Sequence, residues 1–182
     1  MRGCAFHSFE EIQRFLLARE RIAAHVILST ILATLIYVCY VIAMKIISLV
    51  PELYCSNLPQ TLDFYIRVLG FTLIFERKEE SFAYLQKGRA HMMFEEIGAS
   101  RQWITGEMQK PFGRGVNFQI EIDAVDDLYK VVTVNECTLV LALEDKWYQQ
   151  NDKQIGHRQF VIQDPDGYLL RFYQSLGTRV VR

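Results

Sequence analysis

An order of secondary-structure elements that occurs twice limits the possible folds of this sequence more than any other feature. Alternating apolar residues and turn-forming residues predict a strand, a helix and three strands, then the same order again after a linker at 98–114. Asp63-Phe64-Tyr65 opens the first helix and leads to Thr72-Leu73-Ile74, as Asp127-Leu128-Tyr129 leads to Thr138-Leu139-Val140. We therefore predict a duplicated βαβββ unit and an α+β fold, with modules at about 46–97 and 115–174.

The boundaries of the elements follow from local residue chemistry. Asn57 can cap the first helix, Pro59 suits its first turn, and Gly70 can supply the left-handed residue that ends it. The second helix is expected at about 125–135, and a tight turn at 164–167 joins the last two strands. The predicted strands are 46–54, 71–78, 82–86, 90–96, 116–122, 138–143, 158–162 and 168–173.

The segment 22–43 contains no formally charged residue and is long enough to cross a bilayer as a helix. Two interpretations of this hydrophobic extension, residues 1–43, stay open: a membrane helix, or translated sequence upstream of a working start at Met44. We favour the second, because a strand leaving a membrane helix without a linker would press the domain of residues 44–182 against lipid headgroups. The corresponding expectations are a cytoplasmic protein or, alternatively, one anchored in the membrane through residues 22–43.

Charge and cysteine content narrow the classes of partner. The chain has 20 basic and 21 acidic residues. It therefore lacks the basic surplus of proteins that bind nucleic acid by electrostatic attraction, and this class of protein is excluded. The four cysteines are far apart and form no CxxC pair, so they are typical of buried thiols in a reducing compartment.

Two stretches, ELYCSNLPQTLDFYIRVLGF and GHRQFVIQDPDGYLLRF, resemble the vicinal-oxygen-chelate superfamily of glyoxalases, extradiol dioxygenases and bleomycin-resistance proteins. The resemblance extends from Met44 to about Gly177. It implies two modules whose mixed sheets curl into a cup, which is usually completed in a homodimer. The fold alone does not decide the function, because it supports both enzymes and binding proteins.

The resemblance implies metal ligands at four positions, which this chain fills with Val50, Met93, Asn117 and Arg171. None of these side chains is a good ligand for a divalent ion, and the charge of Arg171 repels one. We therefore expect no metal, no cofactor and no catalytic residue, as in the metal-free members similar to bleomycin-resistance proteins. A shifted register would instead allow a carboxylate-rich metal site, formed by Glu52, His91, Glu95 and Glu121.

The expected ligand site lies in the cup. Arg171 is expected to be held there by Glu52 or Glu121, because a buried guanidinium needs a partner. Such a pair could bind a ligand, or it could be structural and simply fill the former metal site. Trp103 and Trp147 are expected to stack on a planar ligand, although they could instead close the ends of the core or pack at a dimer contact. The candidate ligand-binding residues are Glu52, Tyr54, Met93, Trp103, Asn117, Gln119, Trp147, Arg171 and Tyr173.

These observations predict a homodimeric, metal-free protein that sequesters a planar or aromatic small molecule and is not an enzyme. The alternative is a metal-dependent lyase or dioxygenase of the same superfamily. The two differ in whether the chain binds a divalent ion and turns a substrate over.

Overall fold

The computed structural model describes residues 14, 30, 49–100 and 103–180 of the chain. The predicted apolar helix at 22–43 lies outside these residues, apart from Thr30. Within the described part of the chain, no helix is both long enough and apolar enough to cross a membrane. Leu49–Arg182 forms one of the two compact units of the chain, and its elements are those described below.

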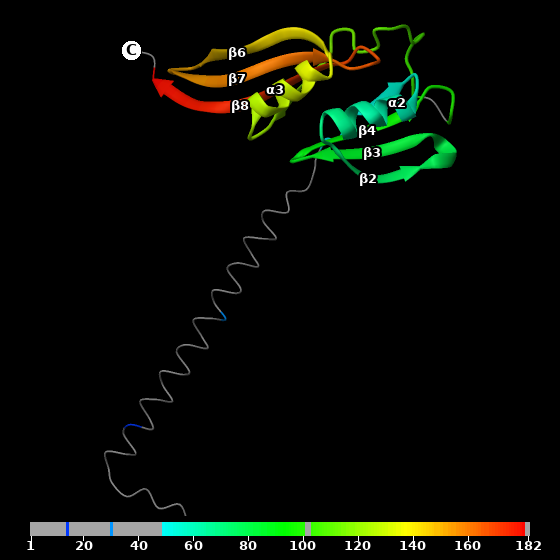
Figure 1. Cartoon of the computed structure of the whole chain (residues 1–182), viewed down its shortest axis with the longest axis horizontal. Helices are drawn as coiled ribbons and strands as arrows, with labels where there is room; N and C mark the ends of the chain where they lie inside the picture. The colour runs from blue at the N-terminus through cyan, green and yellow to red at the C-terminus, as the bar shows by residue number, and fades with distance from the viewer. Residues whose placement is uncertain (1–13, 15–29, 31–48, 101–102, 181–182) are drawn as a thin grey trace, which may run out of the picture. The chain divides into compact units, whose positions relative to one another are not determined.

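The first module is a four-stranded mixed sheet with a helix on one face (Figure 1). Its strands lie in the order β1-β4-β3-β2, with β1 parallel to β4 and the other neighbours antiparallel. Its elements are β1 (Glu52–Cys55), α2 (Leu58–Leu62), the π-helix η1 (Asp63–Val68), β2 (Thr72–Arg77), the 3₁₀-helix η2 (Lys78–Glu80), β3 (Phe82–Lys87) and β4 (Ala90–Glu96).

The second module repeats this order, which confirms the duplicated βαβββ unit. Its strands lie in the order β5-β8-β7-β6, again with the first strand parallel to its neighbour. Its elements are β5 (Asn117–Glu121), α3 (Val125–Val134), β6 (Thr138–Gln150), β7 (Lys153–Gln163) and β8 (Leu169–Val180).

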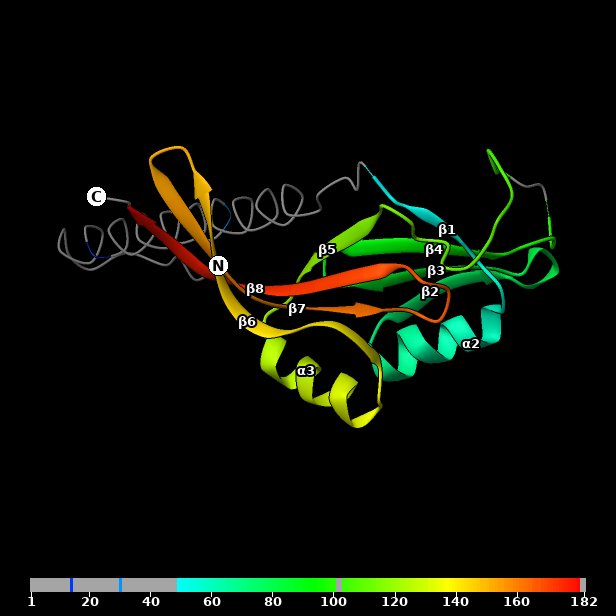
Figure 2. The same ribbon diagram turned by 90° about the horizontal axis from the view of Figure 1, so that it is seen from above.

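Strands β6, β7 and β8 are longer than predicted. The prediction ended the first of them at residue 143, whereas β6 continues to Gln150 and contains Trp147 and Tyr148. The added length forms a three-stranded arm that extends past α3 (Figure 2). Its exposed, polar sequence lacks the apolar alternation of a strand that covers a core, so the sequence pattern missed it.

The first helix begins and ends where its residues predict. The side chain of Asn57 accepts a hydrogen bond from the backbone N–H of Gln60 at 2.8 Å. Arg67 pairs with Asp63 one turn earlier at 2.8 Å, and Gly70 adopts a φ of +71° directly after the helix. The prediction differs in one respect, because the chain turns into a π-helix at Asp63 rather than continuing as an α-helix.

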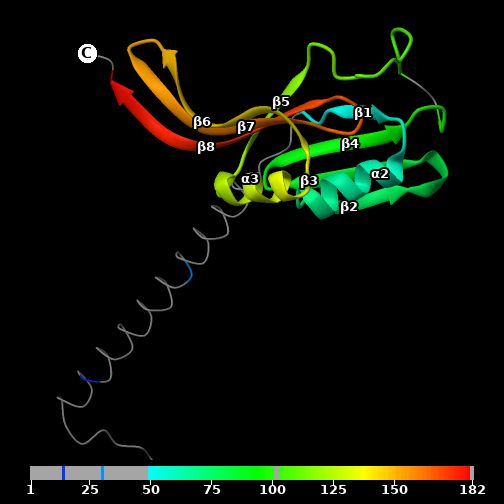
Figure 3. The same cartoon turned by 45° about the horizontal axis from the view of Figure 1, so that its top comes forward.

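One hydrophobic core joins the two modules. Helices α2 and α3 cover the inner face of their own sheets, and Figure 1 shows them between the second sheet above and the first sheet below. Figure 3 shows the same arrangement from a second direction. The aromatic side chains buried completely in this core are Tyr65, Phe94, Phe160 and Phe172.

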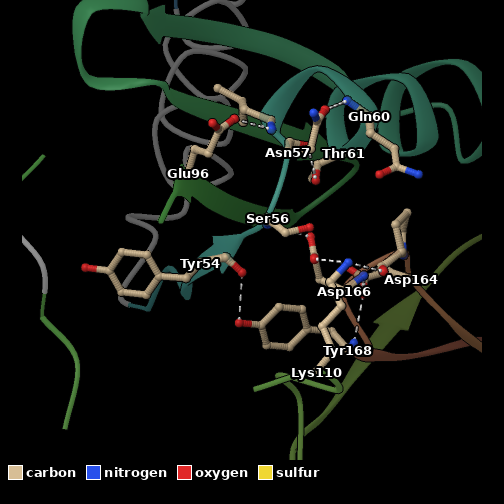
Figure 4. A network of polar contacts seen from close by, with 12 residues as sticks. Tyr54, Ser56, Asn57, Gln60, Thr61, Glu96, Lys110, Asp164, Asp166 and Tyr168 are labelled. Atoms are coloured by element: carbon tan, nitrogen blue, oxygen red, sulfur yellow. Dashed lines mark hydrogen bonds and ion pairs between the residues drawn. The ribbon is translucent and has the colours of Figure 1, made fainter. Parts of the chain in front are cut away.

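A buried polar network at the turn 164–167 also ties the modules together (Figure 4). The Asp164 carboxylate accepts hydrogen bonds from the backbone N–H groups of Asp166 and Tyr168 and from the Tyr65 hydroxyl at 3.0 Å. The hydroxyl of Tyr168 in turn donates a hydrogen bond to the backbone carbonyl of Tyr54 at 3.1 Å. The predicted tight turn is therefore confirmed. It also joins the second module to the first through these hydrogen bonds.

Candidate functional site on the outer sheet faces

The register of the strands assigns each residue to one of two faces. Inward-pointing residues of β4 and β8, such as Phe94 and Phe172, belong to the core, so their neighbours along the strand point the other way. We call the sheet faces turned away from the helices the outer faces. The paired residues Glu52 and Met93 lie on the outer face of the first sheet, and Gln119 and Arg171 lie on that of the second.

The outer face of the first sheet carries a pair of carboxyl groups at its β1–β4 side. Glu52 hydrogen-bonds the side chain of Glu95, and Ser100 donates a hydrogen bond to Glu95 at 2.7 Å. Burial and the adjacent Glu95 raise the pKa of Glu52, which Arg77 lowers only partly. The ionised form of Glu52 is therefore disfavoured. A carboxyl group of this kind can share a proton with its neighbour Glu95 or accept a hydrogen bond from a ligand.

A row of aromatic rings lies beside this pair on the same face, on strands β2 and β3. Phe75 stacks on Tyr84 with ring centroids 5.2 Å apart, and on Phe82 at 5.9 Å. His91 lies beside Tyr84 at 5.7 Å, and the guanidinium of Arg77 covers the Phe82 ring at 3.6 Å. Sequence reasoning missed this row. The strict alternation of Phe82 and Tyr84 with core residues along β3 could have identified it.

The outer face of the second sheet is more polar. Arg171 donates a hydrogen bond from Nη2 to the side-chain oxygen of Gln119. The expected pairing of Arg171 with Glu52 or Glu121 is wrong, because Glu121 instead pairs with Arg89 at 3.1 Å and Glu52 lies beside Glu95. Gln119 is the residue directly opposite Arg171 in the parallel register, which brings its side-chain oxygen within hydrogen-bond reach of the guanidinium.

Next to Arg171 on this face lies a second group of rings. Tyr173 stacks on His157 with centroids 4.1 Å apart and an interplanar angle of 29°. Burial and the nearby Arg171 lower the pKa of His157, which Glu121 raises only partly, so the neutral imidazole is favoured. Gln159 completes the group by donating hydrogen bonds to Tyr148 at 2.7 Å and to Glu144 at 2.9 Å. Of these residues, only Tyr173 was among the predicted site residues.

The two tryptophans lie in different parts of the described domain, Trp103 in the linker and Trp147 in β6. Trp147 is in β6, opposite Gly156, so it lies on the other face of the arm from Tyr148, where Arg179 covers its ring at 4.1 Å. Trp103 is in the linker with 66% of its surface exposed, and its backbone N–H donates to the Tyr54 hydroxyl at 2.7 Å. The structure thus brings Trp103 close to Tyr54 and places Trp147 on a different surface. The remaining predicted residue, Asn117, is exposed at the start of β5.

The donors at the positions implied by the resemblance do not fit a divalent metal ion. Met93, Asn117 and Arg171 lie on the outer faces and supply one thioether, one amide and one cation. In residues 49–100 and 103–180, moreover, no three His, Cys, Asp or Glu side chains lie close enough together to hold one ion. The alternative carboxylate-rich metal site is likewise divided between the two sheets. Glu121 lies on the second sheet, where it pairs with Arg89, whereas the other three residues lie on the first.

Comparison with known proteins agrees with this architecture. The family model described as "Glyoxalase/Bleomycin resistance protein/Dioxygenase superfamily" matches residues 45–172. The bleomycin resistance protein of Geobacillus stearothermophilus is 24% identical over 136 residues, which cover 70% of this chain and 96% of that protein. The same values hold for the bleomycin resistance protein of Staphylococcus aureus.

Solved structures share the fold. The crystal structure of TioX from Micromonospora sp. ML1 matches with a TM-score of 0.54 at 22% identity, over 70% of this chain and 98% of that one. An integron cassette protein from V. cholerae matches with a TM-score of 0.53 at 22% identity, over 72% of this chain and 97% of that one. The family match covers both modules, so this chain belongs to the glyoxalase/bleomycin resistance protein/dioxygenase superfamily.

Proposed function

We propose that this chain is a binding protein that sequesters a planar or aromatic small molecule without a metal ion. The observation that carries the proposal is the composition of the outer faces. They combine stacked rings with a few polar groups, and their residues at the metal positions of the superfamily are Met93, Asn117 and Arg171. Aromatic surface with a few fixed polar groups is typical of sites for small planar ligands.

We further propose that the working form is a homodimer. The inner faces of both sheets are buried against the helices in one core, and the outer faces lie on opposite sides of that core (Figure 1). A single chain therefore offers two open half-sites, such as the one around Phe75, which is 46% exposed. A second copy that lays its outer face against one of them would enclose a ligand from both sides. We propose a cytoplasmic location, in keeping with the reduced cysteines Cys55 and Cys137.

The similarity to bleomycin resistance proteins supplies the first ligand to test. Metal-free bleomycin is titrated into the purified full-length chain by calorimetry, and the bound drug is afterwards recovered and analysed by mass spectrometry. We expect saturation at a fixed ratio per dimer and recovery of unchanged ligand, for bleomycin or for another planar aromatic compound of a screened set. Conversion of the ligand, with loss of activity on chelation, would instead favour the metal-dependent lyase or dioxygenase.

A further inference from the structure

The outer face of the second sheet contains buried polar atoms that have no hydrogen-bond partner among the described residues. They include Nε of Arg171 and Nδ1 of His157. His157 is only 9% exposed, so solvent has little access to its ring. Buried donors and acceptors are almost always satisfied in folded proteins, and exceptions point to a missing partner. Two such atoms on one outer face therefore indicate that a further group belongs there.

The charge of Arg171 is also unbalanced. The partner of its guanidinium is the neutral amide of Gln119. The two carboxylates of this face are engaged elsewhere, because Glu121 pairs with Arg89 and Glu144 accepts from Gln159. No acidic side chain in the described part of the chain forms an ion pair with Arg171 within 4.0 Å. A partly buried guanidinium in this state favours an anionic partner.

The surroundings limit the kind of anion. The ring of Tyr173, which stacks on the buried His157, adjoins Arg171 and offers a flat apolar surface. The carboxylates of Glu121 and Glu144 lie on the same face and would repel a doubly charged group such as a phosphate monoester. A planar monoanion, in which a carboxylate is conjugated to an aromatic ring, meets both the guanidinium and the rings.

We propose that the ligand of this protein is an aromatic carboxylate, whose carboxylate group is bound by Arg171 and whose ring lies against Tyr173. The inference rests on the proposed binding function and adds the chemical class of the ligand. The guanidinium of Arg171 donates hydrogen bonds to the carboxylate, and the His157 ring supports Tyr173 by stacking on it. The amide of Gln119 holds the guanidinium in position.

The test compares probes that differ only in charge. The purified full-length chain is titrated by calorimetry with 2-naphthoate, with the neutral 2-naphthamide and with the cationic 2-naphthylmethylamine. We expect 2-naphthoate to bind at least about tenfold more tightly than the amide, since a hydrogen bond to a charged group contributes that much. The cationic amine is expected to bind most weakly. This comparison needs no variant and therefore does not depend on how a variant folds.

Two variants then assign the preference to Arg171. Arg171→Gln is expected to remove it, so that 2-naphthoate and 2-naphthamide bind with equal affinity. Arg171→Lys keeps the charge but loses the planar group, and is expected to retain only part of the preference. The matched control is Arg67→Gln, which removes an exposed cation paired with Asp63 on the first helix and should change the affinity for 2-naphthoate by less than about threefold.

The outcomes separate this inference from the proposed function. If 2-naphthamide binds as tightly as 2-naphthoate, the carboxylate inference is wrong and the binding function stands. If Arg171→Gln weakens self-association and leaves the affinity for 2-naphthoate unchanged, the partner of Arg171 is a second copy of the chain, and the inference is also wrong. If no planar aromatic compound binds at all, the proposed function fails, and the inference fails with it.

Discussion

At the level of single residues, the outer faces contain a carboxyl group whose ionised form is destabilised by its surroundings. Glu52 is the clearest case, because its neighbour is a second carboxyl group, Glu95, and both lie on the same face. Burial and this neighbour raise the pKa of Glu52 above its usual value of 4.5. Such a residue reduces the stability of the fold when it is ionised. Residues of this kind are common at binding sites, where function is maintained at the expense of stability.

Replacing Glu52 by Gln should therefore stabilise the protein at neutral pH. The pKa of Glu52 is higher in the folded state than in the unfolded state, so ionisation of this group lowers the free energy of unfolding. The loss grows as the pH rises from about 4.5 through the folded-state pKa. We expect a gain below about 1 kcal/mol at pH 7, since the residue is largely exposed, and no gain near pH 4. Chemical denaturation at both pH values measures it.

The matched control is Glu79→Gln, which neutralises an exposed carboxylate in η2. It should change stability little at either pH. An equal gain for Glu79→Gln, or a Glu52→Gln variant that is less stable at pH 7 than at pH 4 relative to the native chain, would contradict this account.

The sequence predicted a good part of the residue-scale arrangement. It identified the residues of β1, β4, β5 and β8 that face away from the core, because alternation along a strand fixes the face once the register is known. It did not find the partner of Arg171 or the rings of His157 and Tyr84. Those contacts depend on which residues stand opposite one another across strands that are distant in sequence.

At the scale of elements, the turn 164–167 illustrates how backbone geometry joins the two modules. Gly167 has a φ of +98°, and a Cβ atom there would lie 2.3 Å from the Cβ of Pro111 in the linker. The glycine is therefore required both by its backbone angle and by the close approach of the linker. The sequence predicted the turn, because its residue types are specific, but not the contact with Pro111.

Gly167→Ala should consequently destabilise the protein by about 2 kcal/mol or more, through backbone strain and overlap together. Gly115→Ala is the matched control, because Gly115 has a φ of +81° but open space around the added Cβ. It should cost only the backbone part, about 1 kcal/mol. Urea unfolding of both variants measures the difference, and equal costs would show that the overlap with Pro111 is relieved.

At the scale of the whole molecule, the duplicated sequence does not produce two independent folding units. Residues of both sheets and both helices form one core, and Tyr65 of the first module bonds Asp164 of the second. The sequence predicted two modules correctly, but the shared core depends on how the inner faces meet, which no local pattern specifies. We therefore expect the domain of residues 49–180 to unfold as one cooperative unit.

Tyr65→Phe tests this coupling. It leaves the buried Asp164 without the hydroxyl donor, and we expect a loss of ~1–2 kcal/mol at pH 7 with a single unfolding transition. Burial raises the pKa of Asp164 and the Tyr65 hydroxyl lowers it, so the variant should raise that pKa further. Its cost should then shrink as the pH falls and Asp164 becomes protonated.

The measurement uses circular dichroism and tryptophan fluorescence during urea unfolding, because Trp103 and Trp147 report on the linker and the second module. Two separated transitions, or a cost that grows toward low pH, would contradict a shared core held by this contact.

We propose that this chain has the fold of the superfamily without its metal chemistry, and the metal content of the purified protein decides between this proposal and a metal-dependent enzyme. The purified full-length chain is incubated with Ni²⁺, Mn²⁺, Fe²⁺ and Zn²⁺ in turn, freed of excess ion and analysed by mass spectrometry. We predict less than ~0.1 ion per chain for each metal, because Met93, Asn117 and Arg171 do not make a divalent site. About one tightly held ion per chain would contradict the account and favour a metal-dependent enzyme.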